Sequence, residues 1–206
     1  MADTCTQCGA TITLSQAVRD KYPGWVPKIC MTCKRGKTGG PGVAVVEENL
    51  TTAEVLARYS AGPQDGVFTD GSSIPNPGPG GWGAVYVRGG SVVAQSHGRD
   101  PATTNNRMEL TALINAFELV PAGVAATVYT DSKLAVSTIN EWAAGWEKLG
   151  WKRKTGAIQN LDLIKVLYAK ARARPEVRLE WIRAHNGTRW NEYADSLSTA
   201  WMRETI

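Results

Sequence analysis

The middle of the chain has the hydrophobic pattern of an antiparallel sheet followed by strand and helix units. Three apolar, strand-like stretches at residues 67–70, 81–88 and 91–98 follow one another and are joined by glycine-rich turns. A helical pattern then runs from Asn105 or Asn106 to Leu119 and ends before Pro121. The remaining predicted elements are a strand (126–131), helices (132–144 and 160–172), a strand (177–183) and a helix (191–204). This change of pattern predicts an α/β fold with one mixed sheet and helices packed on it.

The first third of the chain has a different composition. A glycine-rich basic stretch runs from Lys34 to Gly42 and has the character of a flexible linker. Thr51 and Glu54 form a capping-box pattern, which predicts a short helix to about Tyr59. The glycines and proline of residues 61–66 then predict a break before the main domain. We therefore predict a small module at residues 1–36, a linker with a short helix at 37–65, and the main domain at 66–206.

All four cysteines lie in that first module, as two CxxC pairs separated by 21 residues. This spacing is typical of a structural zinc site in which each pair supplies two thiolates. Two disulfides or idle thiols are the alternative, and a reducing compartment disfavours them. The segment between the pairs is too short to build a core, so a metal would hold it together. The predicted ligands of one structural Zn²⁺ are Cys5, Cys8, Cys30 and Cys33.

Charge and length narrow the class of protein further. The chain has 206 residues and a net charge of +4, and residues 1–42 carry all of that excess. A basic appendage on a neutral body favours a polyanionic partner, although a small basic module can also be merely soluble. No apolar run approaches the roughly 20 residues of a membrane span, and the first residues lack a basic, apolar leader. We expect a cytoplasmic protein that does not enter membranes, and we expect a monomer.

Four acidic residues occur where a fold could bring them together. Asp70 and Asp131 each end a predicted strand, and the ends of neighbouring parallel strands meet at one edge of a sheet. Glu109 lies on the apolar face of its helix, where a carboxylate needs a partner or a proton. Asp195 lies near the start of the last predicted helix, beside its apolar face. Each acid alone has an ordinary structural explanation, but four together favour an oxygen-only site for Mg²⁺ or Mn²⁺.

Several motifs resemble those of the type 1 ribonuclease H family. They are Thr69-Asp70-Gly71-Ser72, Asn76-Pro77-Gly78-Pro79-Gly80-Gly81-Trp82-Gly83, Thr104-Asn105-Asn106-Arg107-Met108-Glu109-Leu110, Thr130-Asp131-Ser132, and His185-Asn186-Gly187 with Asn191, Glu192 and Asp195. The resemblance covers residues 66–206 in order. It implies the ribonuclease H fold, with a five-stranded mixed sheet in the order 3-2-1-4-5.

The same resemblance implies an activity and a set of roles. The activity is hydrolysis of the RNA strand of an RNA–DNA hybrid by two-metal-ion catalysis, which leaves 5′-phosphate and 3′-hydroxyl ends. The implied ligands of two Mg²⁺ or Mn²⁺ ions are Asp70, Glu109, Asp131 and Asp195. His185 matches the residue that moves protons or helps product leave, although a lone loop histidine is often incidental.

Substrate contacts are also implied by the resemblance. Asn76, Asn105 and Asn106 match minor-groove contacts, although asparagine is also a turn former and a helix N-cap. Lys133 departs from the family, which usually has glutamine there, and a cation at this position can reach a phosphate. The stretch from Trp142 to Lys154 corresponds to a basic handle, whose tryptophans can bind substrate or simply pack on the body. The other implied substrate-binding residues are Gly71, Ser72, Thr104, Trp151, Lys152, Arg153 and Lys154.

Two alternatives to a hybrid-specific endonuclease remain at this point. The first is a zinc-containing nucleic-acid-binding protein with an inactive ribonuclease H domain. The second is the same fold with a different specificity, such as a DNA nuclease. The presence of all four acids together with His185 favours the enzyme.

Overall fold

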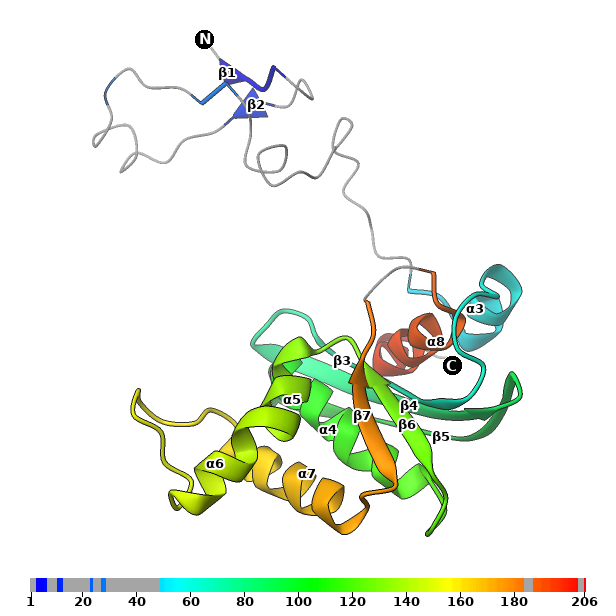
Figure 1. The fold of residues 1–206 in the computed structure, drawn as a ribbon. Coiled ribbons are helices and arrows are strands. Elements are labelled where there is room, and N and C mark those ends of the chain that lie inside the picture. The colour runs from blue at the N-terminus through cyan, green and yellow to red at the C-terminus, as the bar shows by residue number, and fades with distance from the viewer. Residues whose placement is uncertain are drawn as a thin grey trace. The chain divides into compact units, whose positions relative to one another are not determined.

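The computed structural model of the chain describes residues 3–6, 11–12, 23, 27–28, 49–183, 187–203 and 206. The chain divides into two compact units, residues 1–48 and 49–206, and each is described by itself (Figure 1). In the first unit, β1 (Asp3–Thr4) pairs antiparallel with β2 (Thr11–Ile12). Cys5 follows β1 and is buried, whereas the other predicted zinc ligands, Cys8, Cys30 and Cys33, lie outside the described residues.

The second unit is built on one five-stranded sheet. Its first three strands, β3 (Gly66–Ser73), β4 (Gly78–Arg88) and β5 (Ser91–Thr103), form an antiparallel meander. β6 (Ala126–Thr130) then pairs parallel with β3, and β7 (Val177–Trp181) pairs parallel with β6. The spatial order β5-β4-β3-β6-β7 is the order 3-2-1-4-5 when these five strands are counted along the chain. The predicted sheet is therefore confirmed.

The helices differ from the prediction at several boundaries. Beyond α3 (Thr52–Arg58) and α4 (Asn105–Leu119), the predicted helix 132–144 is three pieces: α5 (Lys133–Ser137), a π-helical turn (Thr138–Trp142) and α6 (Ala143–Lys148). The others are α7 (Leu161–Ala173), α8 (Arg189–Ser198) and a 3₁₀ turn (Ala200–Met202). The predicted helix 191–204 thus ends early. After Thr199 the hydrogen bonding changes, because the N–H groups of Met202 and Arg203 donate to the carbonyls three residues earlier, and the chain continues as the 3₁₀ turn.

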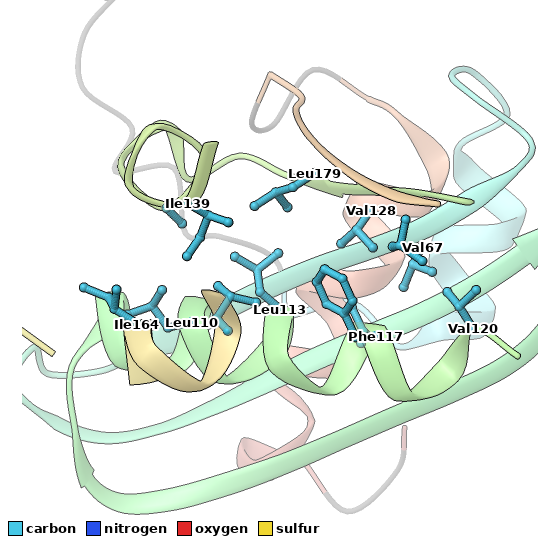
Figure 2. Close-up of a cluster of buried hydrophobic side chains, with 14 of the residues drawn as sticks. Val67, Leu110, Leu113, Phe117, Val120, Val128, Ile139, Ile164 and Leu179 are labelled. Carbon is cyan, nitrogen blue, oxygen red and sulfur yellow. The ribbon is translucent and has the colours of Figure 1, made fainter. Parts of the chain in front are cut away.

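Successive side chains of the central strands point to opposite faces of the sheet and pack in two hydrophobic cores, one on each face. Val67 of β3 points into the core beneath α4, and the next residue, Phe68, points into the core beneath α8. On the α4 side, Leu113 and Phe117 pack against Val128 and Val67 (Figure 2). The sheet is therefore the middle layer, with α4 to α7 on one face and α3 with α8 on the other (Figure 1).

Residues 49–65 belong to this second unit. α3 contacts α8, and the α3 side chain Val55 is only 1% exposed within the core beneath α8. The predicted linker 37–65 therefore includes residues that pack as part of the main unit. Within the described part of the chain, no helix is both long enough and apolar enough to cross a membrane.

Candidate active site

Asp70 and Asp131 lie together because β3 and β6 run side by side. Thr69 pairs with Thr130 in the parallel register, and each aspartate is the next residue of its chain. The prediction that β3 ends at Asp70 is wrong, since β3 continues along β4 to Ser73, with Asp70 opposite Gly83. Its pairing with β6, however, stops at Thr69. Asp70 therefore stands where the sheet opens beside the carboxyl end of β6, and it is half-buried.

Glu109 reaches this edge because α4 crosses very close to β3. A Cβ atom built on Gly71 would lie 2.2 Å from the backbone nitrogen of Glu109, so only glycine permits this approach. The helix begins just before, where the Thr104 side chain accepts a hydrogen bond from the Arg107 N–H. Glu109 is thereby fixed on the first turns of α4, over the end of β3. Gly71, predicted as a substrate contact, lies buried under this backbone.

The pKa of the Glu109 carboxyl responds to its burial and to two of the other predicted ligands. Burial raises the pKa of its carboxyl to about 7, a hydrogen bond with the Ser132 side chain opposes the rise, and the charges of Asp131 and Asp70 add to it. Ser132 follows Asp131 and is the N-cap of α5. Glu109, Asp131 and Asp70, three of the four predicted ligands, therefore share one electrostatic environment.

Asp195 is carried to the same edge by α8, which packs on β3 and β4. A Cβ atom on Gly83 would lie 2.4 Å from the Leu197 Cβ, so helix and strand are in close contact opposite Asp70. One turn after Asp195, the Ser198 hydroxyl donates to Asp70 Oδ2 over 2.6 Å and lies 3.0 Å from the Asp195 carbonyl oxygen. Ser198 therefore links Asp70 to the helical turn that carries Asp195.

These carboxylates fit a divalent metal by their chemistry. All four ligand candidates are oxygen donors, and the like charges that raise the Glu109 pKa are what a cation would neutralise. Among the residues that the structure describes, no three acidic, histidine or cysteine side chains form a ready-made metal cluster. Serine hydroxyls bond two of the acids instead, Ser198 to Asp70 and Ser132 to Glu109.

The predicted minor-groove residues gather at the start of α4. The Asn76 side-chain oxygen accepts a hydrogen bond of 3.3 Å from the Asn105 N–H, which joins the loop after β3 to the helix start. Asn76 and Asn106 are exposed. The Asn105 side-chain oxygen is buried and has no hydrogen-bond partner in the described structure. Ser72 lies behind them, with its hydroxyl 3.3 Å from that of Ser198.

Lys133 is the first residue of α5, two positions after Asp131. Its Nζ sits 4.2 Å from the centre of the Trp181 ring, and the Trp181 indole N–H donates to the Asp131 carbonyl over 3.0 Å. Both side chains are exposed.

Sequence reasoning missed Trp181, whose only signal was its place at the end of the strand beside β6. It also missed that Ser132 and Ser198 hydrogen-bond acidic residues of the site, although Ser132 adjoins Asp131 and Ser198 follows Asp195 by one turn.

A cavity of about 280 Å³ extends from Glu109 toward the basic handle, residues 142–154. Glu109 and Asn106 line one part of it, and Trp142, Trp146 and Arg153 line another. Trp151 is half-buried and meets Tyr168 of α7 edge-on, with ring centres 5.9 Å apart.

The predicted substrate-binding cations of the handle, Lys152, Arg153 and Lys154, are all exposed. Trp146 and Trp151 thus pack the handle on the body, whereas Trp142 and these cations are exposed. His185 lies outside the described residues, so its role stays a prediction.

Comparison with known proteins gives the family. A family model described as RNase H matches residues 63–203. The chain is 46% identical over 140 residues to Ribonuclease H of Methylorubrum extorquens, covering 68% of this chain and 60% of that protein. It is 46% identical over 133 residues to Ribonuclease H of Aromatoleum aromaticum, covering 64% of this chain and 86% of that protein.

Solved structures agree in fold. The crystal structure of LC9-RNase H1, a type 1 RNase H with the type 2 active-site motif, matches with a TM-score of 0.52 and 34% identity over 68% of this chain and 74% of that chain. LC11-RNase H1, crystallised in complex with an RNA/DNA hybrid, matches with a TM-score of 0.50 and 23% identity over 66% of this chain and 98% of that chain, and this likeness concerns the fold alone. The matched segment carries the sheet, all four acids and the helices that place them, and the chain belongs to the ribonuclease H family.

Proposed function

We propose that this chain hydrolyses the RNA strand of RNA–DNA hybrids by two-metal-ion catalysis. The observation that carries the proposal is the convergence of acids on Glu109, whose carboxyl has a pKa raised to about 7 by burial and by the charges of Asp131 and Asp70. The named relatives are ribonucleases H, and one solved structure of the same fold is a complex with an RNA/DNA hybrid.

The ligands in this proposal are Asp70, Glu109, Asp131 and Asp195. Two Mg²⁺ or Mn²⁺ ions held there would supply an activated water and stabilise the departing ribose oxygen. The chain's own part is to fix the carboxylates in advance. Ser198 orients the Asp70 carboxylate, and Ser132 orients that of Glu109. At neutral pH a bound cation would favour the ionised form of Glu109, because it would offset the charges of Asp131 and Asp70.

Proton transfer to the product falls to His185 in this proposal, and the products carry 5′-phosphate and 3′-hydroxyl ends. A histidine suits this step because its ordinary pKa lies near neutrality. His185 precedes Gly187, whose N–H donates to the Glu192 side chain over 3.3 Å.

Recognition of the hybrid uses two groups of exposed residues. Asn76 and Asn106 present amides, which both donate to and accept from a 2′-hydroxyl. Lys133 and the handle cations of residues 152–154 neutralise phosphates of the backbone. Asn106, Glu109 and Arg153 line one cavity, which links the two groups to the acids.

We further propose that the first module holds one structural Zn²⁺. Both the N–H and the hydroxyl of Thr6 donate to the Lys28 carbonyl, each over 2.9 Å. Thr6 follows Cys5, and Lys28 stands two residues before Cys30, so these bonds join a residue of the first CxxC pair to the chain that precedes the second pair in sequence. Thiolates in both segments require a reducing compartment, which is why we place the protein in the cytoplasm.

The test is cleavage of an end-labelled RNA–DNA hybrid beside duplex DNA and duplex RNA of the same sequence. We expect cleavage of the RNA strand of the hybrid alone, in Mg²⁺ or Mn²⁺, and none in chelator. Asp70→Asn is the matched inactive control. Cleavage of duplex DNA would show a different specificity, and binding without cleavage would show an inactive domain.

A further inference from the structure

Residues 49–62, which we call the strap, precede the segment matched by the family model and pack along α8. Figure 1 shows α3 of the strap beside α8, on the face of the sheet opposite α4. We propose that the strap is a positioning element for Asp195. The proposal rests on the proposed function, because it takes Asp195 as a metal ligand.

The middle of the strap enters the core beneath α8. Val55 is 1% exposed and belongs to the cluster that contains Trp190, Tyr193 and Leu197 of α8. α3 has seven residues, which is too short for a stable helix without tertiary packing. Its capping box is complete, because the Thr51 N–H donates to the Glu54 carboxylate and the Glu54 N–H donates to the Thr51 hydroxyl. The strap is thus folded against α8.

The C-terminal end of the strap is bound to the first residues of α8. The Arg189 N–H donates to the Ala61 carbonyl over 2.9 Å, and its guanidinium donates to the Tyr59 carbonyl. Ala61 also forms a parallel bridge with Thr188, the N-cap of α8. Gly62 has a φ of +100°, and a Cβ atom there would lie 2.3 Å from the Thr188 Cγ2. The contact needs glycine both for its backbone angle and for its lack of a side chain.

The N-terminal end of the strap is bound to the last turn of α8. The Ser196 hydroxyl donates to the Leu50 carbonyl over 2.7 Å. Beyond the helix, the Arg203 guanidinium donates to the side chain of Asn49 and to the Ser196 carbonyl. The strap therefore contacts α8 at both ends of the helix, through hydrogen bonds, and in the middle, through the core.

The strap and the sheet hold two different faces of α8. Arg189 and Ser196, whose side chains donate to strap carbonyls, lie seven residues apart on one helical face. Tyr193 lies between them and packs in the cluster of Val55, while its hydroxyl donates to Gln95 of β5. Trp190, Ala194 and Leu197 form a second face, buried in the cores against the sheet. At about 100° per residue, Asp195 lies on neither face. The direction of the Asp195 side chain is consequently set by the rotation of α8 about its axis. The contacts with the strap and with the sheet together fix that rotation.

The tolerance for that rotation is small. A carboxylate about 5 Å from the helix axis moves by nearly 2 Å when the helix turns by about 20°. Metal and catalytic groups need placement within about 0.5 Å. A helix held on the sheet side alone would therefore place Asp195 too loosely, and the strap supplies the second contact.

The test compares three full-length variants. Val55→Ala shortens the core contact of the strap, and Gly62→Ala disturbs its contact with Thr188. Val120→Ala is the matched control, because Val120 is 2% exposed and lies in the other core, away from α8. We measure amide hydrogen exchange of α8, calorimetric binding of Mn²⁺, binding of an uncleaved hybrid in chelator, and kcat against KM in Mg²⁺.

For both strap variants we expect amide exchange in residues 189–198 to rise about tenfold, which corresponds to about 1.4 kcal/mol. Mn²⁺ binding should weaken and kcat should fall, whereas hybrid binding in chelator and KM should stay unchanged. Val120→Ala should leave α8 exchange and Mn²⁺ binding unchanged. Strap variants that lose stability but match Val120→Ala in every other measurement would overturn the inference. A wild-type protein that fails to cleave hybrid would instead overturn the proposed function.

Discussion

Glu109→Gln should stabilise the metal-free protein at alkaline pH. The carboxyl of Glu109 has a pKa of about 7 in the folded chain, against an ordinary value of 4.5, mainly because it is buried and then because Asp131 and Asp70 lie near. A raised pKa means that the folded state binds this proton more tightly than the unfolded state does. The resulting stabilisation is fully present below about pH 4.5 and is lost as the pH rises through 7.

The magnitude follows from the size of the shift. A difference of about 2.5 pKa units corresponds to about 3 kcal/mol of lost stability when Glu109 is ionised. Glutamine keeps the shape of the side chain and carries no charge, so the variant avoids this loss. At pH 8 the variant should therefore be more stable by up to about 3 kcal/mol, or roughly 6–12 °C in melting temperature for a domain of this size. Near pH 4.5 the two proteins should be nearly equal.

The assay is thermal and urea unfolding in chelator between pH 4.5 and pH 8.5. The difference between variant and wild type is the quantity of interest, because other titrating groups cancel in it. Glu180→Gln is the control, since Glu180 is exposed on β7 and its replacement should change stability by less than about 0.5 kcal/mol. Added Mg²⁺ should stabilise the wild type more than the Glu109 variant. Equal stability of the variant and wild type at pH 8 would refute the raised pKa of Glu109.

Other changes test the rest of the site. Asp70→Asn should abolish Mg²⁺-dependent cleavage and keep or raise the metal-free melting temperature, and a marked fall in that temperature would show a structural role. Replacing Lys152, Arg153 and Lys154 with alanine should reduce the salt dependence of hybrid binding by up to about three phosphate contacts, measured by titration at several salt concentrations. Lys133→Gln should reduce the same slope by about one contact, and an unchanged slope would place Lys133 away from the backbone. Metal analysis under reducing conditions should find one zinc per chain, and removal of residues 1–42 should leave a Mg²⁺-dependent nuclease with weaker affinity for long hybrids.

The sequence predicted the sheet and the acids for physical reasons that the structure makes clear. Asp70 and Asp131 follow apolar strands, and parallel pairing necessarily brings such ends to one edge. Glu109 was informative because a carboxylate on an apolar helix face needs a partner. The family match confirms the ribonuclease H prediction that these residues supported.

The parts that sequence reasoning missed depend on contacts between distant segments. The bond from Ser198 to Asp70 joins residues that are 128 positions apart, and no local pattern distinguishes this serine from an ordinary helix-end serine. Trp181 and Lys133 meet only because β7 lies beside β6. The splitting of helix 132–144 by a π-helical turn likewise left no signal in the hydrophobic spacing.

The strap shows how a correct local prediction can lead to an incomplete structural one. The capping box at Thr51 and Glu54 predicted α3 correctly, because capping is a local property. Glycine and proline around Gly62 predicted a break before the main domain, and such a break is typical of a linker. In the structure that glycine allows close contact with Thr188 instead. A glycine is common both in exposed linkers and where the backbone closely approaches another element. Only the fold shows that Gly62 contacts the start of α8, the helix that carries Asp195.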